Sequence, residues 1–530
     1  MYARILSVLF VFWTSLLLGQ TLLDVHLEPT EIPGLGGVQS YAFGTHEGEW
    51  LIAGGRLDGL HRRQPWASFD EAGNNNQLIV VNPEEGVSWS ASTSDLDEEI
   101  REQLSSTNFE FYQQAEYLYM IGGYGYSPTI GDHVTHPGMI AIDVPAVINA
   151  VKTGGDFQAH FRRIEDEEFA VTGGYLHYLD GVYYLVGGQR FDGAYNPMNM
   201  PTFVQEYTNA IRRFTVVDDG ENIEVTHLEE WYDEENLHRR DYNAVAQIMP
   251  DGSQGITAFS GVFNSQDLPF LNSVDISDEG YIVNNDFTQY YNHYHCGHIP
   301  LYSGSANEMH TIFFGGMAQF YEVDGGLIQD DNVPFVRTIA QVTRSADGSM
   351  AEYKLDSEMP DLLGSGAEFI PVENLPAYPN EVIDLDALEE DSILLGYLYG
   401  GIRSTDQNIF WINDGTQSEA SSEILAVYLI SQSLSTSNFN EGGEKSLFVV
   451  YPNPSNGELT FQFTLENSVP VEIKMIDEAG KTVFSERYSE QNLKVGENIL
   501  SVDIDLPSGT YTARILAGKL KESQKVILIE

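Results

Sequence analysis

Short apolar runs that end in a glycine pair recur along most of the chain. The six copies end at Gly55, Gly123, Gly188, Gly261, Gly316 and Gly401, at intervals of about 55 to 85 residues. Each run is rich in Val, Ile, Leu, Tyr and Phe, and a polar segment follows it, which is the pattern of a β-strand closed by a turn. In the fourth copy, Ser260 precedes Gly261 in place of the first glycine.

A second apolar run follows each glycine pair after a polar loop. These runs are centred near Val80, Ile140, Phe214, Val274, Ala340 and Ala426, and an outer run such as NIEVTHLEEW or MAEYKL comes next in some copies. The spacing predicts six units of four strands each. A single four-stranded sheet cannot bury both of its faces, so the units must pack against one another.

The last unit supplies only three clear strands, which end with SEILAVYLIS. Residues 22–30 (LLDVHLEPT) alternate between apolar and polar positions, as a half-buried strand does. We expect this N-terminal strand to complete the sixth unit. The alternative is a free N-terminal extension.

Six four-stranded units with a glycine pair after each second strand resemble the Kelch type of β-propeller, over residues 22–431. The resemblance implies a six-bladed propeller. The units are longer than the usual Kelch repeat, and the Tyr and Trp that follow the glycines in that family are mostly missing. The glycines also have a physical reason, because a side chain would clash where the chain turns tightly.

The two ends of the chain have separate roles. Residues 1–20 carry one Arg before an apolar run that ends at a small residue, as in a secretory signal peptide, with a membrane anchor as the alternative. Residues 432–446 are rich in Ser, Asn and Gly and predict a linker between a propeller at 21–431 and a domain at 447–530. Between residues 32 and 440 there are 14 Arg and 2 Lys, whereas residues 441–530 hold 7 Lys and 2 Arg.

Residues 447–530 alternate between strands and Pro, Asn and Gly turns, which predicts a small antiparallel sandwich. The segments YPNPSNG from Tyr451, LPSGTY from Leu506 and KVIL from Lys525 resemble the C-terminal sorting domain of the type IX secretion system of Bacteroidota. The resemblance implies an immunoglobulin-like fold, recognition by the type IX machinery, and export through the periplasm to the cell surface or beyond.

The formal charge of −53 at pH 7 argues against nucleic acid and anionic membranes as partners, since both require clustered Lys and Arg. Adaptation to high salt is an alternative origin of the acidity. No further apolar stretch of about 18 residues occurs, so we expect no transmembrane segment in the mature chain. The single cysteine, Cys296, excludes an internal disulfide.

In propellers, the loop before the first strand of a blade and the loop after its second strand open on one face, where ligands bind. The candidate ligand-binding residues on that face are Arg56, Arg62, Arg63, Arg190, Arg240, His295, His298 and Arg403. Arginine captures carboxylate or sulfate groups through two parallel hydrogen bonds. Trp66, Phe191 and Tyr195 could stack on sugar rings. The alternative is that these arginines form ion pairs that tie neighbouring blades together, as we favour for residues 239–241.

His293, His295, Cys296 and His298 could form a transition-metal site, but alternate positions on a strand face opposite ways, so we expect no metal and no cofactor. A copper radical oxidase would use Cys296 beside Tyr290, Tyr291 or Tyr294. A sugar-acid mutarotase or epimerase would use Arg clamps and a base such as Glu368. No repeated sialidase Asp-box motif occurs.

We therefore predict an all-β secreted or cell-surface protein that binds an extracellular glycan or a protein through one propeller face. A carbohydrate-active enzyme on the same fold is the alternative function, and a structural envelope component is a third.

Overall fold

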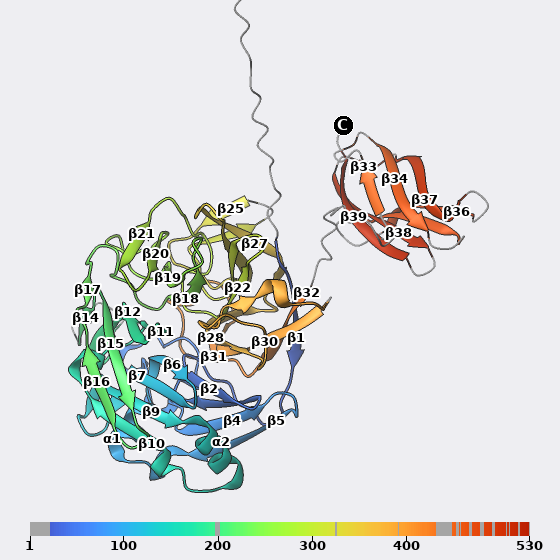
Figure 1. The fold of residues 1–530 in the computed structure, drawn as a ribbon. Coiled ribbons are helices and arrows are strands. Elements are labelled where there is room, and N and C mark those ends of the chain that lie inside the picture. The colour runs from blue at the N-terminus through green and yellow to red at the C-terminus, as the bar shows by residue number, and fades with distance from the viewer. Residues whose placement is uncertain are drawn as a thin grey trace, which may run out of the picture. The chain divides into compact units, whose positions relative to one another are not determined.

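The computed structural model describes residues 22–196, 202–323, 326–390 and 392–430, and most of residues 448–528. The predicted signal peptide and linker lie outside the described residues. The chain divides into two compact units, Met1–Leu434 and Ser435–Glu530. Strands dominate both units (Figure 1), which confirms the all-β prediction.

In the described part of the first unit, six sheets follow one another, each built on four antiparallel strands, and four of them carry a short fifth strand. The first sheet contains β2 (Ala42–His46), β3 (Glu49–Ala53), β4 (Gln77–Asn82) and β5 (Val87–Ser92). The second contains β6 (Thr107–Gln114), β7 (Tyr117–Ser127), β9 (Gly138–Asp143) and β10 (Phe161–Glu165). The third contains β11 (Tyr175–Leu179), β12 (Val182–Val186), β15 (Ala210–Asp218) and β16 (Ile223–His227).

The fourth sheet contains β18 (Asn243–Ile248), β19 (Gln254–Phe259), β20 (Ser273–Ile276) and β21 (Tyr281–Asn284). The fifth contains β22 (His298–Ser303), β23 (Glu308–Phe314), β26 (Thr338–Arg344) and β27 (Met350–Glu358). The sixth contains β28 (Leu362–Pro371), β30 (Ser392–Ser404), β32 (Ile424–Ile430) and β1 (Asp24–Thr30). Each predicted glycine-terminated run is the second strand of its sheet, and the run near Val80 and its five counterparts are the third strands.

The N-terminal strand completes the sixth sheet, as predicted. β1 pairs antiparallel with β32 over its whole length, from Asp24 opposite Ile430 to Thr30 opposite Ile424. Val25 of β1 and Leu23, which directly precedes the strand, are buried in the apolar cluster of the fifth and sixth sheets. The two ends of the first unit are thereby joined in one sheet.

Short elements are added to this plan. In the described part of the first unit, the helices α1 (Glu98–Leu104) and α2 (Val144–Thr153) lie in connections of the first two sheets, and the sequence analysis did not predict them. The additional strands are β8 (Asp132–Thr135), β13 (Gln189–Gly193), β14 (Phe203–Tyr207), β17 (Trp231–Tyr232), β24 (Phe320–Val323), β25 (Gly326–Gln329), β29 (Ile383–Asp384) and β31 (Ser418–Ala420). The β13–β14 hairpin is inserted after the third glycine pair.

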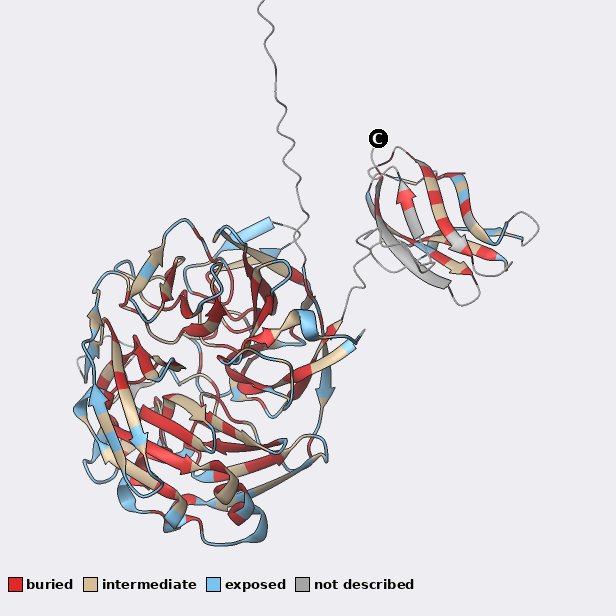
Figure 2. Cartoon of the chain, viewed as in Figure 1, coloured by how far each residue is buried: buried red, intermediate tan, exposed pale blue. Residues whose placement is uncertain are grey.

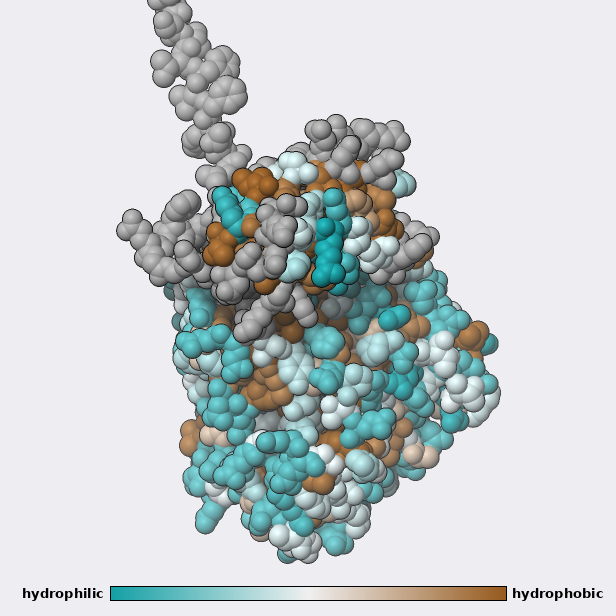
Figure 3. All heavy atoms as spheres, turned by 90° about the vertical axis from the view of Figure 1, so that its right-hand side faces the viewer, coloured by the Kyte–Doolittle hydropathy of each residue, from teal (hydrophilic) through white to brown (hydrophobic). Residues whose placement is uncertain are grey.

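Apolar clusters lie between each sheet and the next (Figure 2). The sixth sheet also packs on the first, where Trp50 of β3 lies in one cluster with Tyr399 of β30 and Ile370 of β28. Every sheet therefore buries both faces against neighbouring sheets. On the face drawn in Figure 3, hydrophilic residues predominate and hydrophobic ones are scattered.

Backbone hydrogen bonds join the six sheets in a closed cycle, which we call the axial ring. Four residues of the ring precede the innermost strand of their sheet, whereas Asn108 lies near the start of β6 and Gly366 lies within β28. In chain order the six are Ser40, Asn108, Gly173, Asp241, His295 and Gly366. The N–H of each donates to the carbonyl of the residue before it in this order, and the N–H of Ser40 donates to Gly366, over 2.7–3.2 Å. The N–H and carbonyl groups of these six residues thus satisfy one another.

The second unit contains two antiparallel sheets around one apolar cluster. One holds β33 (Phe448–Tyr451), β34 (Glu458–Leu465) and β37 (Gly496–Asp503). The other holds β36 (Thr482–Tyr488), β35 (Val471–Ile476), β38 (Gly509–Ala517) and β39 (Leu520–Leu528). In the motif from Leu506, the buried Tyr511 hydroxyl donates to the carbonyl of Pro507 over 2.8 Å and fixes the turn before β38.

Candidate functional site

A pocket of about 680 Å³ lies against the axial ring, five of whose six residues line it. Every sheet contributes residues just before or within its innermost strand, and every sheet also contributes residues beyond the glycine pair of its second strand, such as residues 59–61 of the first. These are the two kinds of loop that the sequence analysis assigned to one face. We call this cavity the axial pocket.

One side of the axial pocket is a set of aromatic side chains in mutual contact, which we call the aromatic wall. Its members are Phe69, Tyr124, Phe191, Tyr195 and Phe203. The rings of Phe191 and Phe203 stack with centroids 4.5 Å apart, and Tyr195 lies 5.9 Å from both Phe69 and Phe191. The β13–β14 hairpin supplies Phe191 and Phe203 across its two strands, so the insertion in the third sheet builds much of this wall.

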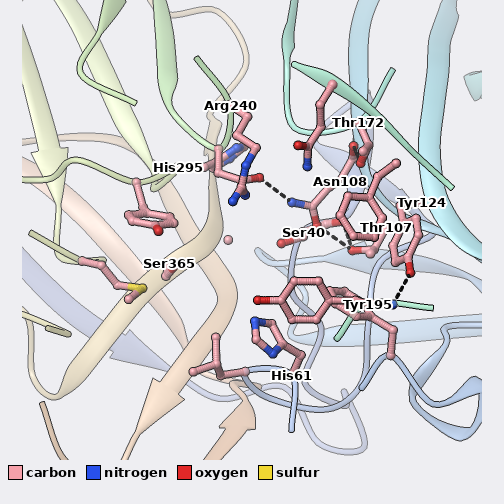
Figure 4. A pocket seen from close by; sticks show the side chains of 18 of the residues that line it. Ser40, His61, Thr107, Asn108, Tyr124, Thr172, Tyr195, Arg240, His295 and Ser365 are labelled. Atoms are coloured by element: carbon pink, nitrogen blue, oxygen red, sulfur yellow. Dashed lines mark hydrogen bonds and ion pairs between the residues drawn. The ribbon is translucent and has the colours of Figure 1, made fainter. Parts of the chain in front are cut away.

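His61 lies beside the aromatic wall (Figure 4), with its ring 4.6 Å from that of Tyr195 and 5.5 Å from that of Phe410. Burial lowers the pKa of His61 to about 4, an effect that Arg240 and Arg56 reinforce. The imidazole is therefore neutral at pH 7. No well-aligned hydrogen bond from the described residues reaches its buried Nδ1.

Polar side chains form the other side, which we call the polar wall. Arg240 is paired with Asp241, and its Nε also donates to the Tyr207 hydroxyl over 2.9 Å. The other Asp241 oxygen accepts from Asn108 Nδ2 over 3.1 Å. Burial opposes the charge of Arg240, but the Asp241 carboxylate raises its pKa well above the usual value, so the guanidinium is charged.

His238 adds to the polar wall. Its ring stacks on Tyr207 with centroids 3.7 Å apart, and its Nδ1 lies 2.7 Å from Asn209 Oδ1. Burial lowers the pKa of this imidazole, as does the charge of Arg240. His238 is therefore a neutral hydrogen-bonding group near pH 7.

His295 lines the pocket beside Ser365 (Figure 4). Its Nε2 lies 2.8 Å from Oε1 of Glu368, and its ring stacks on Tyr175 at 5.7 Å. Burial opposes a charged ring, but the Glu368 carboxylate raises the pKa of His295 overall. Glu368, considered above as a base, is buried on β28 and is not among the residues that line the pocket.

Arg56 also lines the pocket, but its guanidinium is fully engaged. Its Nε and Nη2 donate to the two oxygens of Asp58 over 2.7 Å each, and Nη1 donates to Asn74 over 2.8 Å. The side chain is only 3% exposed. Arg56 therefore braces the loop between β3 and β4.

The structure places Arg56, Arg240 and His295 at the pocket, and five other candidates outside its lining: Arg62, Arg63, Arg190, His298 and Arg403. Arg190 pairs with Asp192 and Glu167, and Arg403 pairs most closely with Glu423. Arg63 is exposed and donates to the carbonyl of Trp411. Because carboxylates neutralise Arg56, Arg190, Arg240 and Arg403, these four arginines do not form a positive patch on this face.

The predicted His and Cys cluster is dispersed. His293 is buried and its two ring nitrogens contact Gln289 and Gln319, whereas His298 Nδ1 lies 3.1 Å from the carbonyl of Cys296. Cys296 packs among apolar side chains, and burial raises the pKa of its thiol to about 12. Among the described residues, no group of three His, Cys, Asp or Glu side chains is placed to hold a metal ion.

Sequence reasoning found Phe191 and Tyr195 of the aromatic wall, but missed several other pocket residues: Phe69, Asn108, Phe203, Tyr207, Phe263 and Phe410. The aromatic content of the segment after Gly188 was a signal for Phe203 and Tyr207. Trp66, expected to stack on sugars, is 84% exposed and is not among the lining residues.

Comparison with known families identifies the second unit. Residues 449–530 match the secretion system C-terminal sorting domain family. This domain marks proteins that the type IX system exports to the cell surface or the extracellular space, so the type IX machinery recognises the chain and the protein is secreted or displayed on the cell surface. Among the helices of the described part of the chain, none is long and apolar enough to cross a membrane.

The comparison with curated proteins found no match. A solved structure titled "Structure of YjhT" aligns with 74% of this chain and 97% of its own, at 11% sequence identity and a TM-score of 0.41. A likeness of that degree assigns neither a fold type nor a function.

Proposed function

We propose that the protein is an exported glycan-binding protein whose first unit, residues 21–431, is a six-bladed Kelch-type β-propeller. Three features support the propeller assignment: the closed axial ring, the contact of the sixth sheet with the first, and the glycine pair at the end of five of the six second strands, which Ser260-Gly261 replaces in the fourth. Residues 432–446 are the linker in this account, and the sorting unit has an immunoglobulin-like fold.

The observation that carries the binding proposal is the pairing of an aromatic wall with a polar wall across one pocket. A sugar ring presents C–H groups on its faces and hydroxyl groups around its edge. Aromatic rings such as Tyr195 bind the C–H faces, while planar groups such as those of Asp241 and Asn108 hydrogen-bond to hydroxyls. A volume of about 680 Å³ is within the range of small-ligand sites.

The size of the pocket favours a short end of a glycan. A volume of about 680 Å³ accommodates one or a few sugar residues. We therefore expect one or a few terminal sugar residues to enter the pocket, with the rest of the glycan outside.

One observation favours the alternative, a carbohydrate-active enzyme of the mutarotase or epimerase kind. The buried, neutral His61 offers a ring nitrogen for proton transfer inside the pocket. Exchange between sugar anomers, followed by NMR with the wild type and with His61→Gln, tests this alternative. The oxidase form has no such support, because Cys296 is a buried thiol with a raised pKa.

The binding proposal is tested by screening the mature chain on an array of neutral and acidic glycans, with Tyr195→Ala and Tyr232→Ala as a matched pair. Tyr195 lies in the aromatic wall, whereas Tyr232 is an exposed tyrosine on β17 that is not among the pocket-lining residues. We expect affinity to fall about tenfold or more in Tyr195→Ala alone. Absence of binding to any glycan, or equal effects of the two variants, would overturn the proposal.

A further inference from the structure

The charges that line the axial pocket limit the class of sugar that fits it. Two arginines and three histidines are the basic side chains at its surface, and two aspartates are the acidic ones. The candidate arginines were selected from the sequence as clamps for carboxylate or sulfate groups, so the state of each basic group decides whether such a ligand can bind.

Each of the two arginines already forms an ion pair with a carboxylate of the protein. Arg56 makes two parallel hydrogen bonds to Asp58 and is almost completely buried. Arg240 is paired with Asp241 and bonded to Tyr207. A carboxylate ligand at Arg240 would compete with Asp241 for the same charge and would bring a second carboxylate close to this partly buried aspartate.

The three histidines that line the pocket do not provide an unpaired positive charge either. His61 and His238 are held neutral by burial and by the nearby arginines. His295, whose ring can be protonated, already faces Glu368 at 2.8 Å. Asp267 adds a further carboxylate to the lining, and the whole chain carries a formal charge of −53. The net charge of the side chains that line the pocket is therefore neutral to negative.

We propose that the axial pocket selects uncharged sugars and excludes sugar acids and sulfated sugars, with Asp241 as the residue that sets this preference. The inference rests on the proposed glycan-binding function. Asp241 accepts hydrogen bonds from both Arg240 and Asn108. The three polar groups thus offer an acceptor between two donors, which suits a pair of adjacent hydroxyls.

The test uses two matched ligands: an oligosaccharide of β-1,4-linked glucose and the same oligosaccharide oxidised at C6 to the uronate. The mature chain is titrated with each by calorimetry at pH 7, after the glycan array has shown that it binds carbohydrate. If the array identifies another neutral sugar, that sugar and its uronate replace the pair. We expect the neutral ligand to bind at least tenfold more tightly.

Two variants distinguish the loss of the ion pair between Arg240 and Asp241 from the loss of one negative charge at the pocket. Asp241→Asn leaves Arg240 without its carboxylate, and Asn tolerates the left-handed backbone at this position, where φ is 49°. Asp267→Asn removes one negative charge at a pocket residue of similar backbone conformation, with φ of 60°, without unpairing an arginine. We expect Asp241→Asn to lose the preference or reverse it, and Asp267→Asn to retain it.

The outcomes are distinct. Tighter binding of the uronate by the wild type, or equal effects of the two variants, would overturn the charge inference and leave glycan binding intact. No binding to any glycan on the array would overturn the proposed function and this inference together.

Discussion

Gly122 and Ser260 show what the recurring glycine positions require of single residues. A Cβ on Gly122 would lie 1.8 Å from the carbonyl oxygen of Val171 in the next sheet, and φ at this glycine is +66°. At the equivalent position of the fourth sheet, Ser260 has φ of +51°. The left-handed backbone is therefore kept even where serine replaces glycine. In the other copies, the close approach of neighbouring backbone explains why the residue is glycine.

Gly122→Ala should destabilise the first unit by about 3 kcal/mol or more, because the new methyl group meets backbone that cannot move aside. Gly131→Ala is the control, since φ is +78° there but no atom lies within 4 Å of the added Cβ. It should cost about 1 kcal/mol, from backbone strain alone. Chemical denaturation measures both, and equal losses would refute the packing explanation.

Glu110 gives a pH-dependent prediction. Its side chain is buried on β6, one oxygen accepts from the Gly174 N–H over 2.7 Å, and Oε2 has no hydrogen-bond partner among the described residues. Burial raises the pKa of Glu110 from 4.5 to about 8. The folded chain then holds a proton that the unfolded chain releases, so this group lowers stability as pH rises from about 4.5 to 8.

Glu110→Gln should therefore gain stability relative to the wild type as pH is raised from 5 to 8, measured as the difference between denaturation midpoints. The exposed Glu116→Gln, at the turn after the same strand, should show no such trend. A constant difference between Glu110→Gln and the wild type across this range would contradict the raised pKa.

At the scale of elements, β1 joins the two ends of the first unit. Without β1, the edge of β32 would be open and the apolar cluster around Leu23 and Val25 would face water. Unpaired strand edges are templates for aggregation. The strand therefore both stabilises the sixth sheet and protects its edge.

Val25→Asp should destabilise the first unit by about 3 kcal/mol or more, because it buries a carboxylate without a partner. His26→Asp, one residue along on the exposed side of the same strand, should change stability by less than about 0.5 kcal/mol. Thermal unfolding measures the stability of the two variants. Equal stabilities would mean that β1 does not contribute to the core.

The elements also show what sequence can predict. Short apolar runs and their spacing located the second and third strands of all six sheets and the pairing partner of residues 22–30, because local periodicity determines them. The helix α2 was missed although Asp143 caps its first turn and Gly154 ends it, since the apolar strand β9 runs directly into it.

The candidate site was predictable only where it follows the glycine pairs or precedes an innermost strand, as Arg240 and His295 do. Which arginines carry a carboxylate partner depends on side-chain contacts that spacing does not determine. Phe410 reaches the pocket from a loop of the sixth sheet to contact His61 of the first, more than 300 residues earlier. Such contacts depend on how the six sheets are arranged in space, which the spacing of residues in the sequence does not determine.

At the scale of the whole molecule, the two units carry different functional features. The second carries the export signal, and the first carries the axial pocket. The compositions agree with this division, because the excess of acidic residues lies mainly before residue 440. A highly negative surface keeps an exported protein soluble and repels anionic partners.

A chain that lacks residues 449–530 should remain inside the cell envelope, because the type IX machinery no longer recognises it. Fractionation and immunoblotting of a type IX-competent host compare it with the full chain and with Tyr195→Ala, which should be exported normally. Export of the truncated chain at the level of the full chain would contradict the assigned role of this unit.

The most direct test of the account is a crystal structure of the mature chain with the neutral oligosaccharide that it binds most tightly. We predict that a terminal sugar residue lies in the axial pocket, with one face against Tyr195 or Phe191 and hydroxyls within hydrogen-bond distance of Asp241 and Asn108. An oligosaccharide bound elsewhere on the molecule, with the axial pocket filled by solvent alone, would contradict the central claim.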